Sequence, residues 1–134
     1  MVYVRKYLDE DFNDVKRIID DGFSTNVTKI ISTSNSFSLV AISNDKIVGH
    51  IRVDCLYDTF KNSNYFVLDY ICVDENYRRL GIGKLLIDEV VKIGIENDIS
   101  YVMFSSLLDN SFIEHVYEKY GFVKDDKYVF RREL

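Results

Sequence analysis

The chain has 134 residues, of which 47% are hydrophobic and 29% charged, and it contains no proline and no tryptophan. This profile is typical of one compact domain, here residues 1–134, and not of a disordered or collagen-like chain. The longest uncharged apolar run is only a few residues, and the first residues have the features of neither a signal peptide nor a transit peptide. We therefore expect a cytoplasmic protein that does not enter a membrane.

The net charge of −5, from 22 acidic and 17 basic residues, opposes binding to the phosphate backbone of a nucleic acid. A nucleic-acid partner is therefore not expected. One segment is especially acidic, and it either attracts a cationic ligand or forms the solvated face of a helix. Its acidic residues are Asp9, Glu10, Asp11, Asp14, Asp20 and Asp21.

The two cysteines, Cys55 and Cys72, lie inside separate apolar runs and lack the spacing of a metal-binding or redox motif. Only two histidines, His50 and His115, are available to complete a metal site, so we expect no metal. In a cytoplasmic protein both thiols are predicted to be free and to pack as small hydrophobic side chains.

Apolar periodicity and turn residues predict regular structure over most of the chain. Residues 24–35, rich in Ser, Thr and Asn, are predicted to be a loop or a short helix. Strands are predicted at residues 2–4, 37–42, 46–56, 65–73 and 101–105, with one or two more within 122–134. Helices are predicted at residues 12–22, at 80–97, and from a capping box at Ser111 and Glu114 to Gly121.

The order of these elements predicts an α/β fold of the α+β type. Its central sheet is expected to be mixed and mostly antiparallel, with six or seven strands and helices on both faces. The strands at 65–73 and 101–105 are expected to pair in parallel, because the helix at 80–97 connects them.

Residues 73–84 (VDENYRRLGIGK) place two arginines and two glycines between an apolar strand and the start of the strongest helix. The first amides of a helix lack partners within it and carry partial positive charge, and glycines let a pyrophosphate approach the main chain. A Walker loop is excluded, because it needs a glycine at position 78 and a serine or threonine at 85, where this chain has Arg78 and Leu85. A Rossmann fingerprint is excluded by Leu86, where it needs its third glycine.

The Arg-x-x-Gly-x-Gly at residues 78–83 resembles the pyrophosphate loop of the GNAT superfamily of acyl-coenzyme-A-dependent N-acetyltransferases. Residues 68–73 (LDYICV) are similar to the family's fourth strand. Asn110, followed by Tyr-Glu-x-x-Gly-Phe from Tyr117, is similar to its second motif. The resemblance covers almost the whole chain, with residues 24–64 matching only in strand pattern, and it implies a GNAT-like fold.

The resemblance implies that acetyl-coenzyme A (acetyl-CoA) is the co-substrate. Ile71, Cys72 and Val73 would pair through their backbone with its pantetheine arm, and Asn110 would hold the arm from the other side. The Ile71 amide would polarise the thioester carbonyl, which is worth a few kcal/mol in a transition state. The main chain near the helix start would hold the pyrophosphate, and the Arg78 side chain would add positive charge. The residues of this site are Arg78, Arg79, Gly81, Ile82, Gly83 and Lys84.

The resemblance also implies that Tyr117 assists the departing thiolate. A phenol of pKa ~10 is a weaker acid than a thiol of pKa ~8.5, so donating a hydrogen bond is easier than early proton transfer. Taken singly, Tyr117 is equally explained as a core tyrosine, and Gly81 and Gly83 as residues that loosen the helix entry. Two positions depart from the family: Glu75 stands where many members have proline, and Val67 where some have a catalytic glutamate.

An amine of pKa ~10.4 is neutral in only about one molecule in 2,500 at pH 7, so the reaction needs a base or a desolvated site. Asp69 is the only charge in its apolar strand, and strict alternation places it on one face with Ile71 and Val73. Burial there would raise its pKa toward a useful value, although such an aspartate equally often orders a water. His50, on the polar face of its strand, is the second candidate.

The leading interpretation is an acetyl-CoA-dependent N-acetyltransferase that acts by direct attack of an amine on the bound thioester. A non-catalytic acyl-CoA-binding regulatory domain is the alternative from another class, and a protein N-terminal acetyltransferase is a further one. The acidic segment favours a small cationic acceptor such as a polyamine or an aminoglycoside. The sequence leaves a homodimer open.

Overall fold

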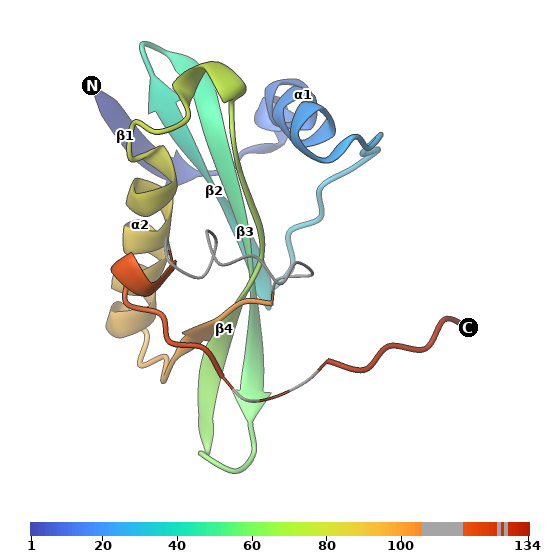
Figure 1. Ribbon diagram of the computed structural model, residues 1–134, viewed down its shortest axis with the longest axis vertical. Helices are drawn as coiled ribbons and strands as arrows, with labels where there is room; N and C mark the ends of the chain where they lie inside the picture. The colour runs from blue at the N-terminus through green and yellow to red at the C-terminus, as the bar shows by residue number, and fades with distance from the viewer. Residues whose placement is uncertain (106–116, 126, 128) are drawn as a thin grey trace.

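A computed structural model describes residues 1–105, 117–125, 127 and 129–134 of the chain. Within these residues five strands form one sheet, in the spatial order β1-β2-β3-β4-β5 (Figure 1). The prediction of six or seven strands was therefore wrong for this part of the chain, because the described residues of 122–134 form no strand. The strands are β1 (Val2–Lys6), β2 (Ser36–Ser43), β3 (Lys46–Asp58), β4 (Ser63–Val73) and β5 (Val102–Met103).

The sheet is mixed, as predicted. The pairs β1–β2, β2–β3 and β3–β4 are antiparallel, whereas β4 and β5 pair in parallel. The parallel pair follows from the helical crossover between them, because two strands joined by a short turn can only be antiparallel. The β2–β3 turn uses Asn44 and Asp45 with φ of 49° and 63°, values that these two residue types tolerate best after glycine.

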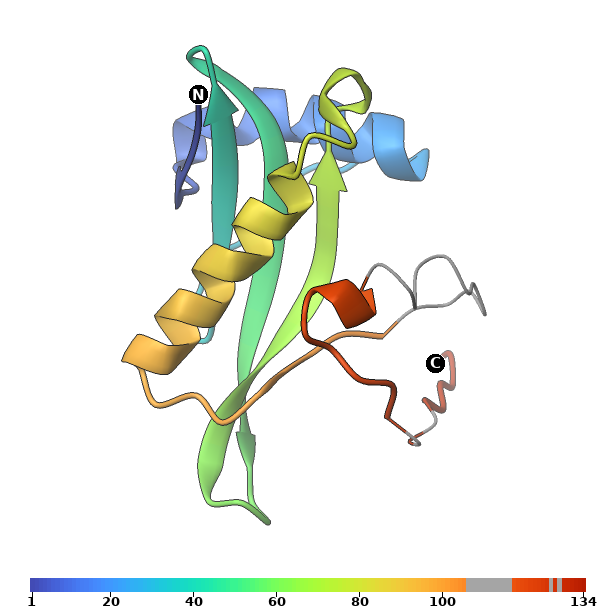
Figure 2. The ribbon, with the colours of Figure 1, turned by 60° about the vertical axis from the view of Figure 1, so that its left-hand side comes forward.

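Helices cover both faces of the sheet, as predicted. Figure 2 shows α2 crossing in front of the strands and α1 lying behind them. Val15, Ile18 and Ile19 of α1 pack on one face, while Leu86, Ile87 and their neighbours on α2 fill the other. None of the helices in the described residues is long and apolar enough to cross a membrane. The helical elements within residues 1–105 are α1 (Phe12–Phe23), α2 (Ile82–Glu96) and two single 3-10 turns, η1 (Asp9–Asp11) and η2 (Glu75–Tyr77).

The start of α2 is placed closely against the sheet by a glycine. A Cβ atom added at Gly49 of β3 would lie only 3.1 Å from Ile82 Cγ2 and 3.2 Å from Leu86 Cδ1. A larger residue would push the helix away from the strand. The helix begins at Ile82, two residues later than predicted, because Arg79 and Gly81 hold φ of 64° and 80° and cannot be helical.

A β-bulge at Asp69 changes which side chains of β4 face each helix. Val53 of β3 pairs with Leu68, and its neighbour Arg52 pairs with Tyr70, so Asp69 is an extra residue on β4. Before the bulge, Phe66 and Leu68 pack on the α2 face. After it, the odd-numbered Ile71 and Val73 pack there, while Tyr70 and Cys72 pack on the α1 face.

The strands β4 and β5 separate after a short contact. Only two residue pairs join them, Phe66 with Val102 and Val67 with Met103. Residues 68–73 of β4 therefore have no strand beside them on that edge within the described part of the chain. The free edge runs directly toward the start of α2.

Candidate active site

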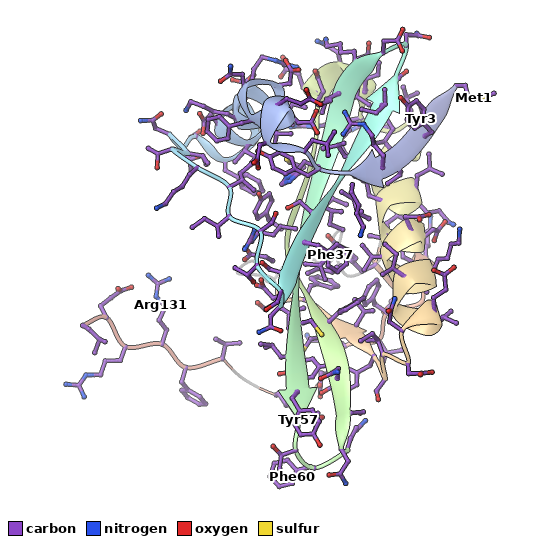
Figure 3. The ribbon with its side chains drawn as sticks, turned by 180° about the vertical axis from the view of Figure 1, so that it is seen from behind. Met1, Tyr3, Phe37, Tyr57, Phe60 and Arg131 are labelled. Carbon is purple, nitrogen blue, oxygen red and sulfur yellow. The ribbon has the colours of Figure 1, made fainter. Side chains whose placement is uncertain are left out.

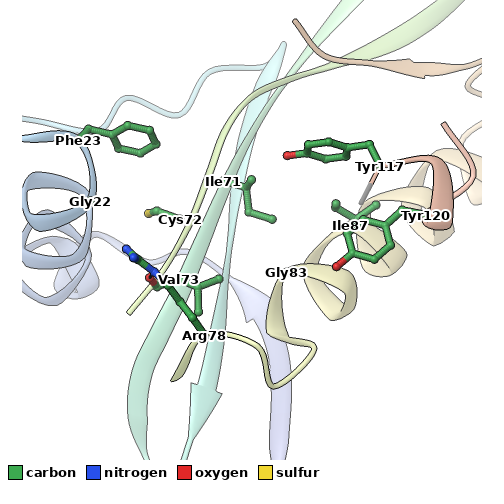
Figure 4. A pocket seen from close by; sticks show the side chains of 10 residues that line it. All are labelled: Gly22, Phe23, Ile71, Cys72, Val73, Arg78, Gly83, Ile87, Tyr117 and Tyr120. Carbon is green, nitrogen blue, oxygen red and sulfur yellow. Dashed lines mark hydrogen bonds between the residues drawn. The ribbon is translucent and has the colours of Figure 1, made fainter. Parts of the chain in front are cut away.

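A pocket of about 480 Å³ lies where the free edge of β4 meets the start of α2 (Figure 4). The end of α1 closes one side, and the helical turn at residues 117–119 closes the other. Most of the lining is apolar, with one arginine as the exception. The lining residues are Gly22, Phe23, Ile71, Cys72, Val73, Arg78, Gly83, Ile87, Tyr117 and Tyr120.

The backbone of β4 offers two amides to this pocket. The Asp74 amide donates to the Val48 carbonyl of β3 at 2.8 Å, and successive amides of an extended strand point to opposite sides. The amides of Val73 and Ile71 therefore point away from β3, toward the free edge. The Cys72 amide points toward β3 instead, so of the three predicted backbone partners of a pantetheine arm only Ile71 and Val73 have amides directed toward the edge.

The first turn of α2 is uncapped. Gly81 is the N-cap and has no side chain, so the amides of Ile82, Gly83 and Lys84 receive no side-chain cap. A Cβ atom at Gly81 would have nothing within 4 Å among the described residues, and one at Gly83 would approach only Ile71, at 3.7 Å. The main chain here is open on the side that faces the pocket. An anion fits this place, because unpartnered amides and the helix dipole both favour negative charge.

Four side chains at and just before the start of α2 differ in their contacts. Arg78 lies beside the pocket, and its Nε donates to the Val73 carbonyl at 3.2 Å. Lys84 is exposed and pairs with Asp88 at 2.7 Å. The Ile82 side chain is buried in the core, so this residue can offer a ligand only its backbone. Arg79 shares with Gly81 the left-handed backbone that turns the chain into α2.

Tyr117 reaches the pocket from the side opposite α1. Its half-buried ring lies 3.9 Å, centroid to centroid, from Phe104, and Figure 4 shows its hydroxyl directed into the pocket. Burial and then the neighbouring Tyr120 raise the pKa of Tyr117 above its usual value. The hydroxyl therefore stays protonated near neutral pH and remains a hydrogen-bond donor. Asn110, predicted to hold the arm with it, lies outside the described residues.

The helical turn that carries Tyr117 ends as predicted at Gly121. The Phe122 amide donates to the Tyr117 carbonyl and the Gly121 amide to the Glu118 carbonyl, each at 3.0 Å. Gly121 itself has φ of 89°, as expected for a glycine that ends a helix in this way. The predicted capping box at Ser111 and Glu114 lies outside the described residues.

Both cysteines are free, as predicted. Cys72 is buried and lines the pocket with its side chain. Burial raises the pKa of its thiol to about 12, an effect that the Arg78 charge only partly opposes. The thiol is therefore uncharged at neutral pH and a poor nucleophile.

The prediction that Asp69 shares a face with Ile71 and Val73 was wrong, because the bulge breaks the alternation on which it rested. The carboxylate lies 3.7 Å from Arg52 Nε, on the α1 face, and 52% of its side chain is exposed. Partial burial and the nearby Asp54 nevertheless raise the pKa of Asp69, and Arg52 opposes them. Asp69 is thus a reachable carboxylate with raised basicity.

His50 was predicted on a polar strand face, and the structure contradicts this. Its side chain is completely buried, because α1 covers that face of the sheet. Neither ring nitrogen has a hydrogen-bond partner among the described residues, and the ring packs between Tyr7 and Tyr70 at 5.7 and 5.4 Å. Burial, with a smaller effect of Arg52, lowers the pKa of His50 to about 4.

Two carboxylates of the acidic segment already have partners inside the chain. Asp11 is buried and forms a bidentate salt bridge with Arg5, whose two N–O distances are 2.7 and 2.9 Å. Asp20 accepts from Lys16 and from the Val27 amide. These contacts lower the pKa of both carboxyl groups and hold the ends of α1 in place. These contacts argue against a role of the whole acidic segment in attracting a cationic ligand.

Sequence reasoning missed four of the ten lining residues, namely Gly22, Phe23, Ile87 and Tyr120. Phe23, at the end of α1, packs on Tyr70 with ring centroids 6.1 Å apart and forms one wall of the pocket. Figure 4 shows the hydroxyl of Tyr120 at the pocket. No local pattern identifies Phe23, because its role depends on how α1 crosses β4.

Known proteins resemble this chain in sequence pattern and in fold. The family model of the acetyltransferase (GNAT) family matches residues 3–122. Similar solved structures include an aminoglycoside acetyltransferase from an uncultured soil metagenomic sample in complex with trehalose (TM-score 0.83, 19% identity, 99% of this chain and 95% of that chain). A ribosomal-protein-alanine N-acetyltransferase from Brucella melitensis biovar Abortus 2308 gives 0.83 at 18% identity, over 99% and 100% of the two chains.

A structure described as a transcriptional regulator from Bacillus halodurans C-125 is equally similar, with a TM-score of 0.86 at 18% identity over 100% of both chains. At such identities these likenesses show a shared fold and not a shared substrate. The family model, in contrast, matches most of the sequence and therefore shows which family the chain belongs to. The chain belongs to the GNAT acetyltransferase family.

Proposed function

We propose that this protein transfers an acetyl group from acetyl-CoA directly to the amine of an acceptor molecule. The observation that carries the proposal is that two sets of backbone donors, which have no partner among the described residues, lie next to each other. The free edge of β4 ends beside the uncapped first turn of α2, and Arg78 bridges the two through its bond to Val73. Such a surface fits a long, extended ligand that has a pyrophosphate at one end.

The residues present fit acetyl-CoA, which supplies an activated acetyl thioester when bound. The amides of Ile71 and Val73 would pair with the amide groups of the pantetheine arm as a further strand would. Asn110 stays proposed as a partner of the arm from the other side, and Cys72 as an apolar contact. The pyrophosphate would be held by Arg78 and by the main chain of Arg79, Gly81, Ile82, Gly83 and Lys84.

The amide of Ile71 is proposed to donate to the acyl carbonyl oxygen, where negative charge develops during transfer. A fixed backbone donor is suited to this role because it costs no reorganisation when the charge appears. Tyr117 is proposed to donate a hydrogen bond to the leaving sulfur, which departs as a thiolate. Its raised pKa keeps the hydroxyl protonated in the neutral range and makes full proton transfer from it harder, so the hydrogen bond is the proposed role.

Asp69 is proposed to take the proton of the acceptor amine, directly or through one water. Its exposure makes it reachable from solvent, and its raised pKa makes it a better base than an ordinary aspartate. His50 is not proposed for this role. A completely buried ring whose pKa is about 4 can neither meet the acceptor nor hold a proton at neutral pH.

A small cationic molecule is the proposed acceptor. Part of the acidic segment stays available, since Asp14 and Asp21 form no ion pair among the described residues. By their descriptions, one similar protein is an aminoglycoside acetyltransferase and another is a ribosomal-protein-alanine N-acetyltransferase. A protein N-terminus is therefore the second acceptor class to test.

The proposal is tested in two steps. Calorimetric titration with acetyl-CoA is expected to show one site per chain. A screen of polyamines, aminoglycosides and short peptides is then followed by the release of free thiol. Thiol release that requires both the acceptor and the enzyme supports the proposal. Tight acetyl-CoA binding with no thiol release from any acceptor would instead indicate a regulatory acyl-CoA-binding domain, and the absence of binding would overturn both functions.

A further inference from the structure

One arginine of β3 is covered on the face of the sheet that carries α1. Ile51 and Val53 pack on the α2 face, so Arg52 between them is directed to the α1 face. Only 18% of its side chain is exposed. A guanidinium covered to this extent needs partners, because an unpaired charge is costly to remove from water.

Each nitrogen of the Arg52 guanidinium has its own partner. The Nη1 atom donates to the carbonyl of Ile31, in the segment that joins α1 to β2. The Nε atom lies 3.7 Å from Asp69 Oδ2 on β4, and the Nη2 atom lies 3.8 Å from Asp54 Oδ1 on β3. A planar guanidinium can serve three partners in fixed directions, whereas a lysine ammonium is a single point of charge.

Arg52 stands directly opposite the β-bulge that contains Asp69. In the register of β3 and β4, Arg52 pairs with Tyr70 and Val53 pairs with Leu68, which leaves Asp69 as the extra residue. An extra residue has no partner in the ladder, so strand pairing fixes its side chain less closely than those of its neighbours. Among the described residues, Arg52 is the only cation that pairs with Asp69.

The backbone contact of Arg52 involves the segment of residues 24–35, which begins at the wall of the pocket. Phe23 precedes the segment and lines the pocket, and Figure 3 shows the segment running from the end of α1 along the sheet to the start of β2. Ile30 packs on the apolar cluster of the α1 face. Through Arg52 the segment is joined to Asp69, so an acceptor that reaches this carboxylate has the segment beside it.

We propose that Arg52 is a positioning residue for acetyl transfer, which orients the Asp69 carboxylate at the bulge and ties the segment of residues 24–35 to the same place. The inference rests on the proposed function, because Asp69 is the proposed base. The distance of 3.7 Å between Arg52 and Asp69 is longer than a direct hydrogen bond. The ion pair therefore orients the carboxylate and leaves its oxygens able to accept a proton.

Two measurements on the free protein test this placement without any acceptor. The first follows the NMR signal of the Asp69 carboxyl carbon as the pH is changed. Removal of the cation in Arg52→Met is expected to move the midpoint to higher pH, because an opposite charge favours the ionised form of a carboxyl group. Arg52→Lys should restore most of the change. Asp54, the other charged group that acts on Asp69, is present in both variants.

The second measurement is amide hydrogen exchange in the same segment. The Thr33 amide donates to a serine hydroxyl of β2 at 3.1 Å, and in Arg52→Met it is expected to exchange about tenfold faster. The Val27 amide is the internal control, because it donates to a carboxylate of α1 at 2.9 Å and should exchange at an unchanged rate.

Turnover is then measured with the amine that releases most thiol in the acceptor screen. Arg52→Met is expected to lower kcat about tenfold or more and to move the acidic limb of the rate profile to higher pH, with acetyl-CoA affinity within a few-fold. Lys61→Met is the matched control. It also removes one positive charge, next to Phe60 at the tip of the β3–β4 hairpin (Figure 3), where the ammonium lies 4.8 Å from the Tyr101 ring centroid.

The outcomes separate this inference from the proposed function. If Arg52→Met changes neither the Asp69 titration nor the Thr33 exchange, the inference is wrong whatever the turnover. If both change but kcat and the acidic limb stay as in the wild type, Arg52 has only a structural role and the inference is again wrong. If the wild-type chain transfers no acetyl group to any amine, the proposed function fails first, and the role of Arg52 in the reaction fails with it.

Discussion

Arg78 and Val73 are joined by a hydrogen bond of 3.2 Å from the guanidinium Nε to the backbone carbonyl. This bond fastens the loop before α2 to the last residue of β4. The bond occupies the Val73 carbonyl, whereas the Val73 amide stays directed toward the free edge of β4. The cation of Arg78 is thereby held at the junction between an edge suited to amide groups and a helix start suited to phosphate.

Gly81→Glu is expected to weaken acetyl-CoA binding about 100-fold. A Cβ atom at this position would meet nothing within 4 Å among the described residues, so no clash at that atom accounts for the loss, and we assign it to the ligand that approaches the main chain there. Gly121→Glu is the matched control, because Gly121 also has positive φ and open space around its Cβ position. Both variants should lose about 1–2 kcal/mol of stability to backbone strain. Undiminished affinity in calorimetry of Gly81→Glu would remove this loop from the binding site.

Cys72→Ala is expected to retain turnover within a few-fold. The pKa of the thiol is raised to about 12, so almost no thiolate exists at the pH of the assay. Direct transfer to the amine requires none. Cys55→Ala, at the half-buried free cysteine, serves as the control in the same thiol-release assay. Loss of turnover in Cys72→Ala with normal coenzyme binding would instead point to an acyl-cysteine route.

Asp69→Asn is expected to lower kcat by about 10²-fold or more if this carboxylate is the base. A base works in its deprotonated form, so the wild-type rate should rise with pH through the raised pKa of Asp69. Asp54→Asn provides a sharper test, because Asp54 helps to raise that pKa. Its removal should shift the acidic limb of the rate profile to lower pH. If neither variant changes the rate profile, Asp69 is not the base, and its remaining role is the pairing with Arg52.

The position of Asp69 illustrates where sequence reasoning fails in this protein. Alternation along β4 correctly identifies a strand with one buried face, but a single extra residue at the bulge exchanges the two faces beyond it. Nothing in the letters LDYICV marks a bulge. Whether the amide of Ile71 or of Cys72 faces the free edge depends on the same register, and only the structure shows it.

Features with local causes were predictable. The arginines and glycines before α2 predict an anion site because helix amides and glycine conformations depend on adjacent residues. Gly121 ends its helical turn for a similar reason. His50 was misjudged because its burial depends on α1, which lies some thirty residues away in sequence and covers the second face of the sheet. Polar residues on a strand indicate solvent only where no helix covers that face.

His50 is expected to make the fold less stable in mild acid. Its pKa is lowered from 6.5 to about 4 on folding, so between these values the unfolded chain binds a proton that the folded chain does not. Stability therefore falls as pH falls through this window, by about 2 kcal/mol from pH 7 to pH 5. Urea unfolding of His50→Phe should show a smaller loss between the two pH values. An equal loss in both proteins would assign the acid sensitivity to other groups.

Tyr117→Phe separates the structural from the chemical role of this residue, because the two side chains differ by one oxygen. The ring contacts with Phe104 and Phe122 are retained, and the stability should change by no more than ~1 kcal/mol. If the hydroxyl assists departure of the thiolate, kcat should fall about 10²-fold while coenzyme affinity stays within a few-fold.

Tyr120→Phe is the control for Tyr117→Phe, since Tyr120 also lines the pocket and is one turn of helix away. A general loss of polarity in the pocket would slow both variants equally. A role of Tyr117 in protonating or hydrogen-bonding the sulfur slows only Tyr117→Phe. Turnover at a saturating acceptor concentration is measured beside thermal melts of all three proteins. An unchanged rate in Tyr117→Phe would leave the Ile71 amide at the free edge of β4 as the main group that stabilises the developing charge.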